Sequence, residues 1–251
     1  MMDNITIVEN FELPSKGKIY GGKQINSKFQ LRSMTTEDEM KRLSHSEDGY
    51  ALMSEMIDSC MTNPTGISSY DMHLGDYQYI LHRLRVVTYG SRYRMSSMCP
   101  VCGNRDEYDI DLDSLDIIEF NLEEFDKYSS VTLPKSNKIV EIKFITPRML
   151  DNIDAKRREA TRKGSKVDNS LLYTLCAIVK SIDGKVYDSI KLEQIMRKLP
   201  LADTNIILKY SDKLNSLIGL NTIIPNICSK CGVDYKIPFR ISSEFFGPSV
   251  D

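Results

Sequence analysis

Four of the six cysteines stand in two C-x-x-C-G motifs that lie far apart in the chain. The first motif contains Cys99 and Cys102, and the second contains Cys228 and Cys231. The glycine that follows each motif lets the backbone turn with a positive φ angle at little steric cost. Two such turns supply four thiolates, which is the ligand set of a closed tetrahedral structural zinc site. A closed site leaves no position for water, so the pattern predicts a structural ion and not a catalytic one.

Other interpretations of these cysteines are a redox pair, two disulfides, four unrelated thiols, or an iron site. A thioredoxin-like redox motif would open a helix, whereas a strand-like run follows each motif here, at 106–112 and 235–241. We therefore expect both motifs at hairpin tips, as in a zinc ribbon. The start of the chain lacks the basic and apolar regions of a secretion signal, which predicts a reducing cytoplasm, where disulfides are rare. Cys60 and Cys176 lie in apolar helical runs and are interpreted as buried small hydrophobic residues.

The distance between the motifs predicts a long-range connection. Between Cys102 and Cys228 lie 125 residues. Closing a loop of that length costs about 4 kcal/mol plus a constant, and structural zinc binding contributes on the order of 10–16 kcal/mol. We therefore expect one ion to tie the C-terminal tail to the middle of the chain, with the intervening residues packed as an insertion.

Composition excludes some functions. The chain has 251 residues, a net charge of −2 and 41% hydrophobic residues, so a packed core is expected. No run of about 18 apolar residues is present, which predicts the absence of a membrane-spanning helix. The near-zero net charge weighs against sequence-independent nucleic-acid binding, which requires clustered excess Lys and Arg. The only basic cluster lies in a helix expected from Pro147 to about Lys163; we interpret it as an exposed face, with binding of phosphate or an acidic partner as the alternative.

Periodicity predicts an α+β fold in which a four-cysteine, zinc-ribbon-like β element joins helical regions. We expect an extended N-terminal arm (1–28), an N-terminal helical region (29–98), a ribbon and β region (99–145 with 220–251) and a mainly helical insertion (146–219). The arm is interpreted as a flexible leader or as a segment that lies on a partner. In the second case its apolar side chains, Leu13, Ile19 and Tyr20, would anchor it.

Helices are expected at about 37–44, 50–61 and 74–89, the last ended by Gly90. Thr36 and Glu39 have the spacing of a capping box at the first helix. The third helix has an apolar stripe, and His82, Arg83 and Arg85 fall on the other side, so we expect them to face solvent.

Three further patterns concern the second half of the chain. The acidic residues from Asp106 to Asp126 lack EF-hand spacing and predict a solvated strand face, with steering of a basic partner as a second use. Asp203 is expected to cap a helix that Gly219 ends. The pair Phe245 and Phe246 forms either an exposed interaction patch or part of the core.

Several segments occur together in one order: 13–20 (LPSKGKIY), 31–39 (LRSMTTEDE), the helix 74–90 and the first cysteine motif at 99–103. In this respect the chain resembles the T4-type bacteriophage base plate protein family, which includes hub subunits and hub assembly factors of contractile tails. The resemblance covers about residues 11–115 and the second cysteine pair. It implies a non-enzymatic role, with baseplate hub proteins and the tape measure protein as partners. It also implies a location in the host cytoplasm during assembly or in the virion tail baseplate. The sequence leaves open whether the protein forms a homo-oligomer.

The alternative function is a zinc-ribbon nucleic-acid-binding or transcription accessory protein. That function requires a basic surface near the motifs. The sequence places five basic residues there, but also the acidic run just after Cys102. These basic residues are Arg92, Arg94, Arg105, Lys230 and Lys236. A zinc enzyme is disfavoured, because four thiolates leave no open coordination position.

Overall fold

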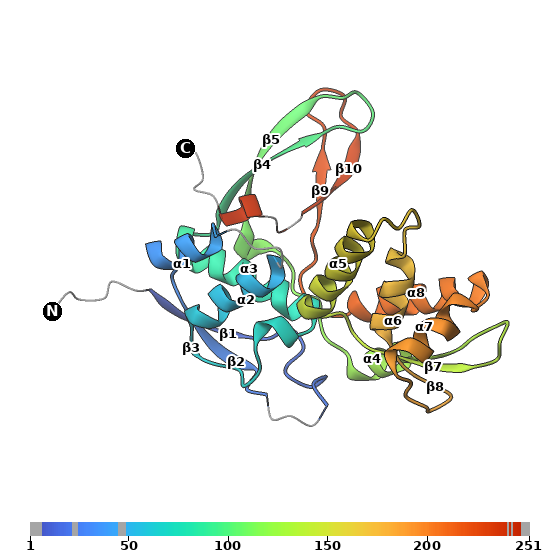
Figure 1. Cartoon of the computed structure of the whole chain (residues 1–251). Coiled ribbons are helices and arrows are strands. Elements are labelled where there is room, and N and C mark those ends of the chain that lie inside the picture. The colour runs from blue at the N-terminus through green and yellow to red at the C-terminus, as the bar shows by residue number, and fades with distance from the viewer. Residues whose placement is uncertain (1–6, 22–24, 45–48, 240, 242, 247–251) are drawn as a thin grey trace.

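The computed structural model describes residues 7–21, 25–44, 49–239, 241 and 243–246. The chain forms two packed bodies, each with its own apolar core, and two β-hairpins that project together from the region between them (Figure 1). We refer to them as the N-terminal body, the second body and the paired hairpins. The architecture is α+β, as predicted, and its sheets are small and antiparallel.

The N-terminal body combines one antiparallel sheet with three helices. Its strands pair in the order β1 (Val8–Glu12), β2 (Lys28–Arg32) and β3 (Met61–Asn63). Its helices are α1 (Thr36–Arg42), α2 (Gly49–Cys60) and α3 (Leu74–Tyr89), with a short 3-10 turn, η1 (Ser69–Asp71), before α3. The three expected helices are therefore present, and Gly90 ends α3 with a φ angle of 85°.

The first helix begins one residue earlier than expected. Thr35, not Thr36, is its N-cap, and Asp38, not Glu39, completes the capping box. Asp38 is favoured at this position because its carboxylate also accepts hydrogen bonds from both terminal nitrogens of Arg32, at 2.6 and 3.1 Å. The bidentate ion pair thus fixes the helix start against the neighbouring strand.

The prediction that one side of α3 faces solvent was wrong for His82 and Arg85. Both residues are buried, because α3 packs against β2, α2 and the 3-10 turn η2 (Leu112–Ser114), and against the C-terminal η3 (Ser243–Phe246). His82 Nε2 bonds the Leu112 carbonyl oxygen at 3.0 Å. Arg85 Nε donates to the carbonyl oxygen of Phe245 at 2.9 Å. Tertiary partners therefore bind polar atoms that the helical pattern assigned to water, namely His82 Nε2 and Arg85 Nε.

Both ends of the described chain contribute to the first core. In the segment expected to be an arm, β1 pairs with β2, and Leu13 and Tyr20 are buried in the core of this chain itself. They therefore do not project from the chain as the anchors of a free arm. Phe245 and Phe246 are also buried in this core, which confirms the core interpretation over the exposed patch.

The second body contains a three-stranded sheet besides its helices. The strands pair in the order β6 (Ser130–Thr132), β7 (Ile139–Ile142) and β8 (Val179–Ile182). The helices are α4 (Leu122–Tyr128), α5 (Pro147–Arg162), α6 (Ser170–Ile178), α7 (Ser189–Arg197) and α8 (Leu201–Asn215). Residues from 120–145, which sequence placed with the ribbon, pack in the core of this body; Phe125, Val140 and Ile142 belong to it.

Two carboxylates accept hydrogen bonds from backbone N–H groups far away in the sequence. Asp203 lies inside the first turn of α8 and does not cap it; it accepts hydrogen bonds from the backbone N–H groups of Lys135 and Ser136 at 2.8 and 2.9 Å. Asp151 of α5 accepts from the backbone N–H groups of Tyr50 and Ala51 at the start of α2. The first contact closes a turn and the second joins the two bodies.

The paired hairpins are β4 (Arg92–Met98) with β5 (Arg105–Asp111), and β9 (Ile223–Ile227) with β10 (Asp234–Pro238). The seven-residue strand β4 leads directly into the first cysteine motif. The exposed residues of β5 include Glu107, Asp109 and Asp111, in agreement with a solvated acidic strand face.

The connections to the second body run side by side. Ile117 and Leu220 form an isolated β-bridge, and the Ile118 N–H donates to the Gly219 carbonyl oxygen at 2.9 Å. Here the backbone of Gly75 in α3 lies against Ile218, and an added Cβ at Gly75 would lie 2.1 Å from the Ile218 carbonyl oxygen. This contact positions the second body against the start of α3.

Candidate metal centre

Each hairpin tip folds into the same tight turn. The Cys99 N–H donates to the Asn104 carbonyl oxygen at 2.8 Å, and the Gly103 N–H donates back to the Cys99 carbonyl oxygen at 3.0 Å. The second tip repeats both bonds, each at 3.0 Å, with Cys228 and Gly232 in the corresponding positions. The two turn glycines have φ angles of 70° and 71°, which favour glycine over residues with a Cβ. Each turn therefore presents two sulfur atoms on one side of its tip.

The structure brings together all four cysteines of the predicted site. Their Sγ atoms all lie within 4.8 Å of one another. Two of the pairs that cross between the hairpins lie 3.7 Å apart (Cys99 and Cys231) and 3.6 Å apart (Cys102 and Cys228). A tetrahedron with bonds of about 2.3 Å to sulfur has edges of about 3.8 Å, so the donor set and its spacing fit one tetrahedral metal ion.

The same distances separate this arrangement from a disulfide framework. A disulfide has an S–S length of about 2.05 Å, well below the distances between these sulfur atoms, and all four thiols are free. Cys99 and Cys228 are buried, whereas Cys102 and Cys231 are exposed at the tips. The cluster therefore has one side toward the hairpins and one side toward solvent.

Electrostatics within the cluster oppose the accumulation of negative charge. Backbone N–H groups of Cys102 and Val101 donate to the Cys99 sulfur and lower the pKa of that thiol to about 7. At Cys231 the backbone N–H of Val233 lowers the pKa, but partial desolvation and the neighbouring sulfur atoms outweigh it and raise the pKa to about 12. Four close thiols thus resist full ionisation on their own, and a bound cation would offset that repulsion.

The hairpins also contact each other through oxygen and nitrogen atoms. The Asp106 carboxylate accepts from the Ser229 hydroxyl at 2.5 Å and from the Ser229 backbone N–H at 3.2 Å. The hydroxyls of Tyr108 and Tyr235 lie 2.7 Å apart, and the Asn226 side-chain amide donates to Tyr108 at 2.6 Å. These contacts cross from the first hairpin to the second, so they hold the two tips in the register that gathers the sulfur atoms.

A buried polar network in the N-terminal body was not predicted. The Asp76 carboxylate, in the first turn of α3, accepts from the Ser15 N–H at 3.0 Å, the Ser15 hydroxyl at 2.5 Å and the Tyr20 hydroxyl at 2.6 Å. The Tyr20 oxygen in turn accepts from the His73 backbone N–H at 3.0 Å. Burial raises the pKa of Asp76, and burial lowers the pKa of His73 to about 3. The sequence signal for this network was an acid in the first turn of a helix, together with Ser15 and Tyr20 in the segment 13–20.

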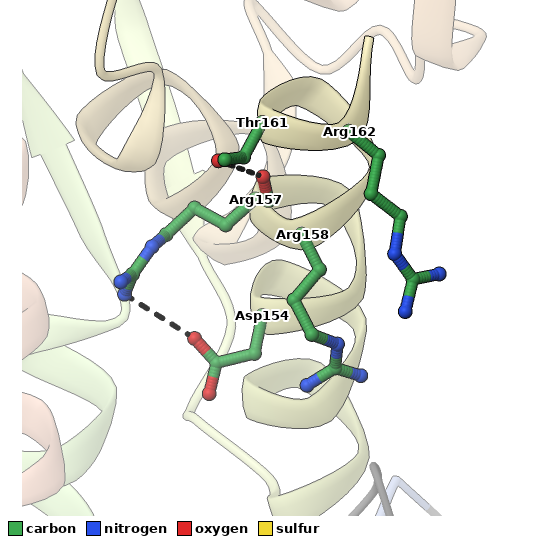
Figure 2. A pocket seen from close by; sticks show the side chains of 5 residues that line it. All are labelled: Asp154, Arg157, Arg158, Thr161 and Arg162. Carbon is green, nitrogen blue, oxygen red and sulfur yellow. Dashed lines mark hydrogen bonds and ion pairs between the residues drawn. The ribbon is translucent and has the colours of Figure 1, made fainter. Parts of the chain in front are cut away.

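The basic cluster lies on the surface of α5. Figure 2 shows Arg157 extending from one side of the helix and Arg158 and Arg162 extending from the other, around a cavity of about 540 Å³. Arg157 pairs with Asp154 at 3.4 Å, and Lys163 pairs with Glu159 at 2.5 Å. Lys156, Arg157, Arg162 and Lys163 are exposed, which confirms the expected exposed helix face. The basic side chains are therefore spread around the helix and interleaved with acids.

Comparison with known proteins identifies the family. A family model described as T4 bacteriophage base plate protein matches residues 5–247, a range that includes both cysteine motifs and the segments that carry the resemblance. No curated protein and no solved structure matches the chain. Within the described residues, no helix is both long enough and apolar enough to cross a membrane. The chain therefore belongs to the T4 bacteriophage base plate protein family.

Proposed function

We propose that this protein is a non-enzymatic baseplate hub component or hub assembly factor that binds hub proteins and the tape measure protein. The family match over residues 5–247 carries this proposal. The proposed activity is recognition of other tail proteins during assembly in the host cytoplasm. Analysis of the protein composition of purified virions would show whether the protein is retained in the tail baseplate.

The paired hairpins offer a surface suited to such binding. They project from the two bodies (Figure 1) and expose Met98, Val101 and Ile227 at 69%, 70% and 64% around the cysteine cluster. Large apolar side chains exposed together near a rigid tip are typical of protein-binding surfaces. In this proposal the tip contacts a partner and the four cysteines keep its shape.

We propose that the cysteine cluster holds one structural zinc ion through Cys99, Cys102, Cys228 and Cys231. The four sulfur donors and their separations support this assignment. When bound, zinc would supply a fixed tetrahedral link between the hairpins and no reactive position. Iron is the competing metal for four thiolates. Metal analysis distinguishes the two, and an iron-loaded protein would be coloured whereas a zinc-loaded protein would be colourless.

Co-expression tests the main proposal. The protein is expressed with the hub proteins and the tape measure protein of the same phage and is purified by a tag on this chain alone. Copurification of one of these proteins is expected. The double variant Val101→Asp/Ile227→Asp should lose it, whereas Val186→Asp/Ile190→Asp should retain it, because those side chains are as exposed, at 74% and 72%, but lie on the second body. Absence of any copurification with the unaltered chain would contradict the proposal.

Nucleic-acid binding finds less support in the same surface. Arg94 on the outer face of β4 is paired with Asp109 at 3.0 Å, and Glu107 and Asp111 are exposed beside it on β5. Mixed charge of this kind does not favour phosphate binding. We expect no salt-dependent mobility shift with DNA or RNA at physiological salt.

A further inference from the structure

A large groove lies where the two bodies meet, away from the cysteine cluster. Its volume is about 760 Å³, within the range of about 300–1,000 Å³ that is typical of ligand pockets. The N-terminal body contributes Ile19, Tyr20 and Ile67 to its walls, and the second body and the start of α5 contribute Phe125, Phe144 and Met149. We call this the central groove.

The floor of the central groove is aromatic and well supported. The Tyr20 and Phe144 rings meet edge to face with centroids 5.7 Å apart, and Phe125 and Phe144 lie 6.5 Å apart. Tyr20 cannot rotate freely, because its hydroxyl is held by the buried Asp76 carboxylate and by the His73 backbone N–H. The floor is therefore formed before any ligand arrives, which reduces the entropy lost on binding.

The rim of the central groove carries an excess of positive charge. Lys143 and Lys180 are exposed side chains that line it. Lys180 pairs with Glu141 at 3.1 Å, whereas Lys143 makes no ion pair in the described parts of the chain. Asp71 also lines the groove, but both its oxygens are bound by Arg148, at 2.6 and 2.9 Å. An apolar ligand with a negative group would thus find a complementary charge at the lysine rim.

We propose that the central groove binds an extended segment of a protein partner, with apolar side chains on the aromatic floor and a carboxylate beside Lys143 and Lys180. The inference rests on the proposed function, because it takes a protein as the partner. The volume accommodates a few side chains and not a folded domain, which favours a short segment. Such a segment would contact both bodies at once, and its binding would stabilise their relative position.

Selection from a library of random short peptides, with the full-length protein as bait, tests this inference. The enriched peptides are expected to place apolar residues next to Asp or Glu. Binding of an enriched peptide, followed by fluorescence polarisation, should weaken by about tenfold or more in Lys143→Glu/Lys180→Glu and in Ile67→Asp. Matched controls are Lys185→Glu/Lys191→Glu and Ile190→Asp, which change exposed residues elsewhere on the second body and should leave binding unchanged.

The outcomes separate this inference from the general function. If no peptides are enriched, if the enriched peptides are basic or wholly polar, or if the groove variants bind as well as the controls, the central groove is not a peptide site. Circular dichroism of each variant shows that a loss of binding is not a loss of fold. Hub proteins can copurify with this chain even if the central groove binds no peptide. A negative peptide result therefore leaves the proposed function standing, whereas the co-expression experiment tests the proposed function itself.

Discussion

The hydroxyl of Tyr20 donates a hydrogen bond of 2.6 Å to the buried carboxylate of Asp76. This contact joins a glycine-containing segment near the N-terminus to the first turn of α3, 56 residues further along. Ser15 donates to the same carboxylate through its backbone and its hydroxyl. The segment 13–20 is thus held in the core by one buried acid, which explains why a stretch without regular structure carries a specific set of side chains.

Tyr20→Phe should lower the free energy of unfolding by about 1–3 kcal/mol, because it leaves the buried His73 N–H without an acceptor and Asp76 with fewer donors. The ring and its packing are kept. Urea unfolding followed by circular dichroism measures the change, with Tyr187→Phe on the second body as the control. An equal, small effect in both variants would show that the hydrogen bond contributes little.

Gly75→Ala should strongly lower the stability of the fold, although it adds only one methyl group. The added Cβ would lie 2.1 Å from the Ile218 carbonyl oxygen and 2.7 Å from its carbon. Both belong to the backbone, so relief requires the second body to move away from α3, at a cost of about 3 kcal/mol or more. Thermal unfolding measures it. Gly49→Ala is the control, since no atom lies within 4 Å of its added Cβ, and its effect should stay within about 1 kcal/mol.

Cys228→Ser should reduce the zinc content from about one ion per chain to near zero, because a structural site requires all four thiolates. Mass spectrometry of the metal and titration with a chromophoric chelator measure it. Cys176→Ser changes a thiol outside the cluster and should retain the metal. If Cys228→Ser retained as much zinc as Cys176→Ser, the metal would be bound elsewhere.

Chelation should also affect stability, since removal of the ion releases the tips that join distant parts of the chain. We expect a strong chelator to lower the thermal midpoint of the unaltered protein and to have little effect on Cys228→Ser. Identical unfolding curves with and without chelator, for a protein shown to contain zinc, would mean that the interlock through Asp106 and Tyr108 suffices to hold the hairpins.

The ion pair between Arg32 and Asp38 predicts a loss of stability in acid. Burial alone would raise the pKa of Asp38, but hydrogen bonds from Arg32 and Thr35 outweigh it and hold the pKa well below its ordinary value of 3.8. The folded state therefore favours the ionised form. The stabilisation is fully present above the unfolded pKa and is lost as the pH falls through the lower folded pKa.

Asp38→Asn isolates this contribution, because asparagine keeps the shape and does not titrate. The unaltered protein should be more stable than the variant near pH 7, and the difference should shrink as the pH falls from about 4 towards 2. Urea midpoints at a series of pH values measure it. A difference that is constant with pH would show that the charge of Asp38 is not the source of its effect.

Local patterns in the sequence were sufficient for some features. The two C-x-x-C-G motifs predict tight turns because each needs only its own few residues and one glycine with positive φ, and both turns formed. The helix 74–89 and its end at Gly90 follow from apolar spacing and a terminal glycine. The gathering of the four sulfur atoms was inferred from ligand chemistry, which imposes a contact over any sequence distance.

Tertiary packing decided what these patterns could not. His82 and Arg85 sit at polar positions of a helix, yet they are buried, because η2 and the C-terminal segment cover that side. The start of α2 is capped by Asp151, which lies 100 residues from Ala51. The partition of 120–145 into the second core likewise depends on which surfaces meet. Periodicity records what one element prefers, whereas burial and hydrogen-bond partners depend on neighbours that only the folded chain brings together.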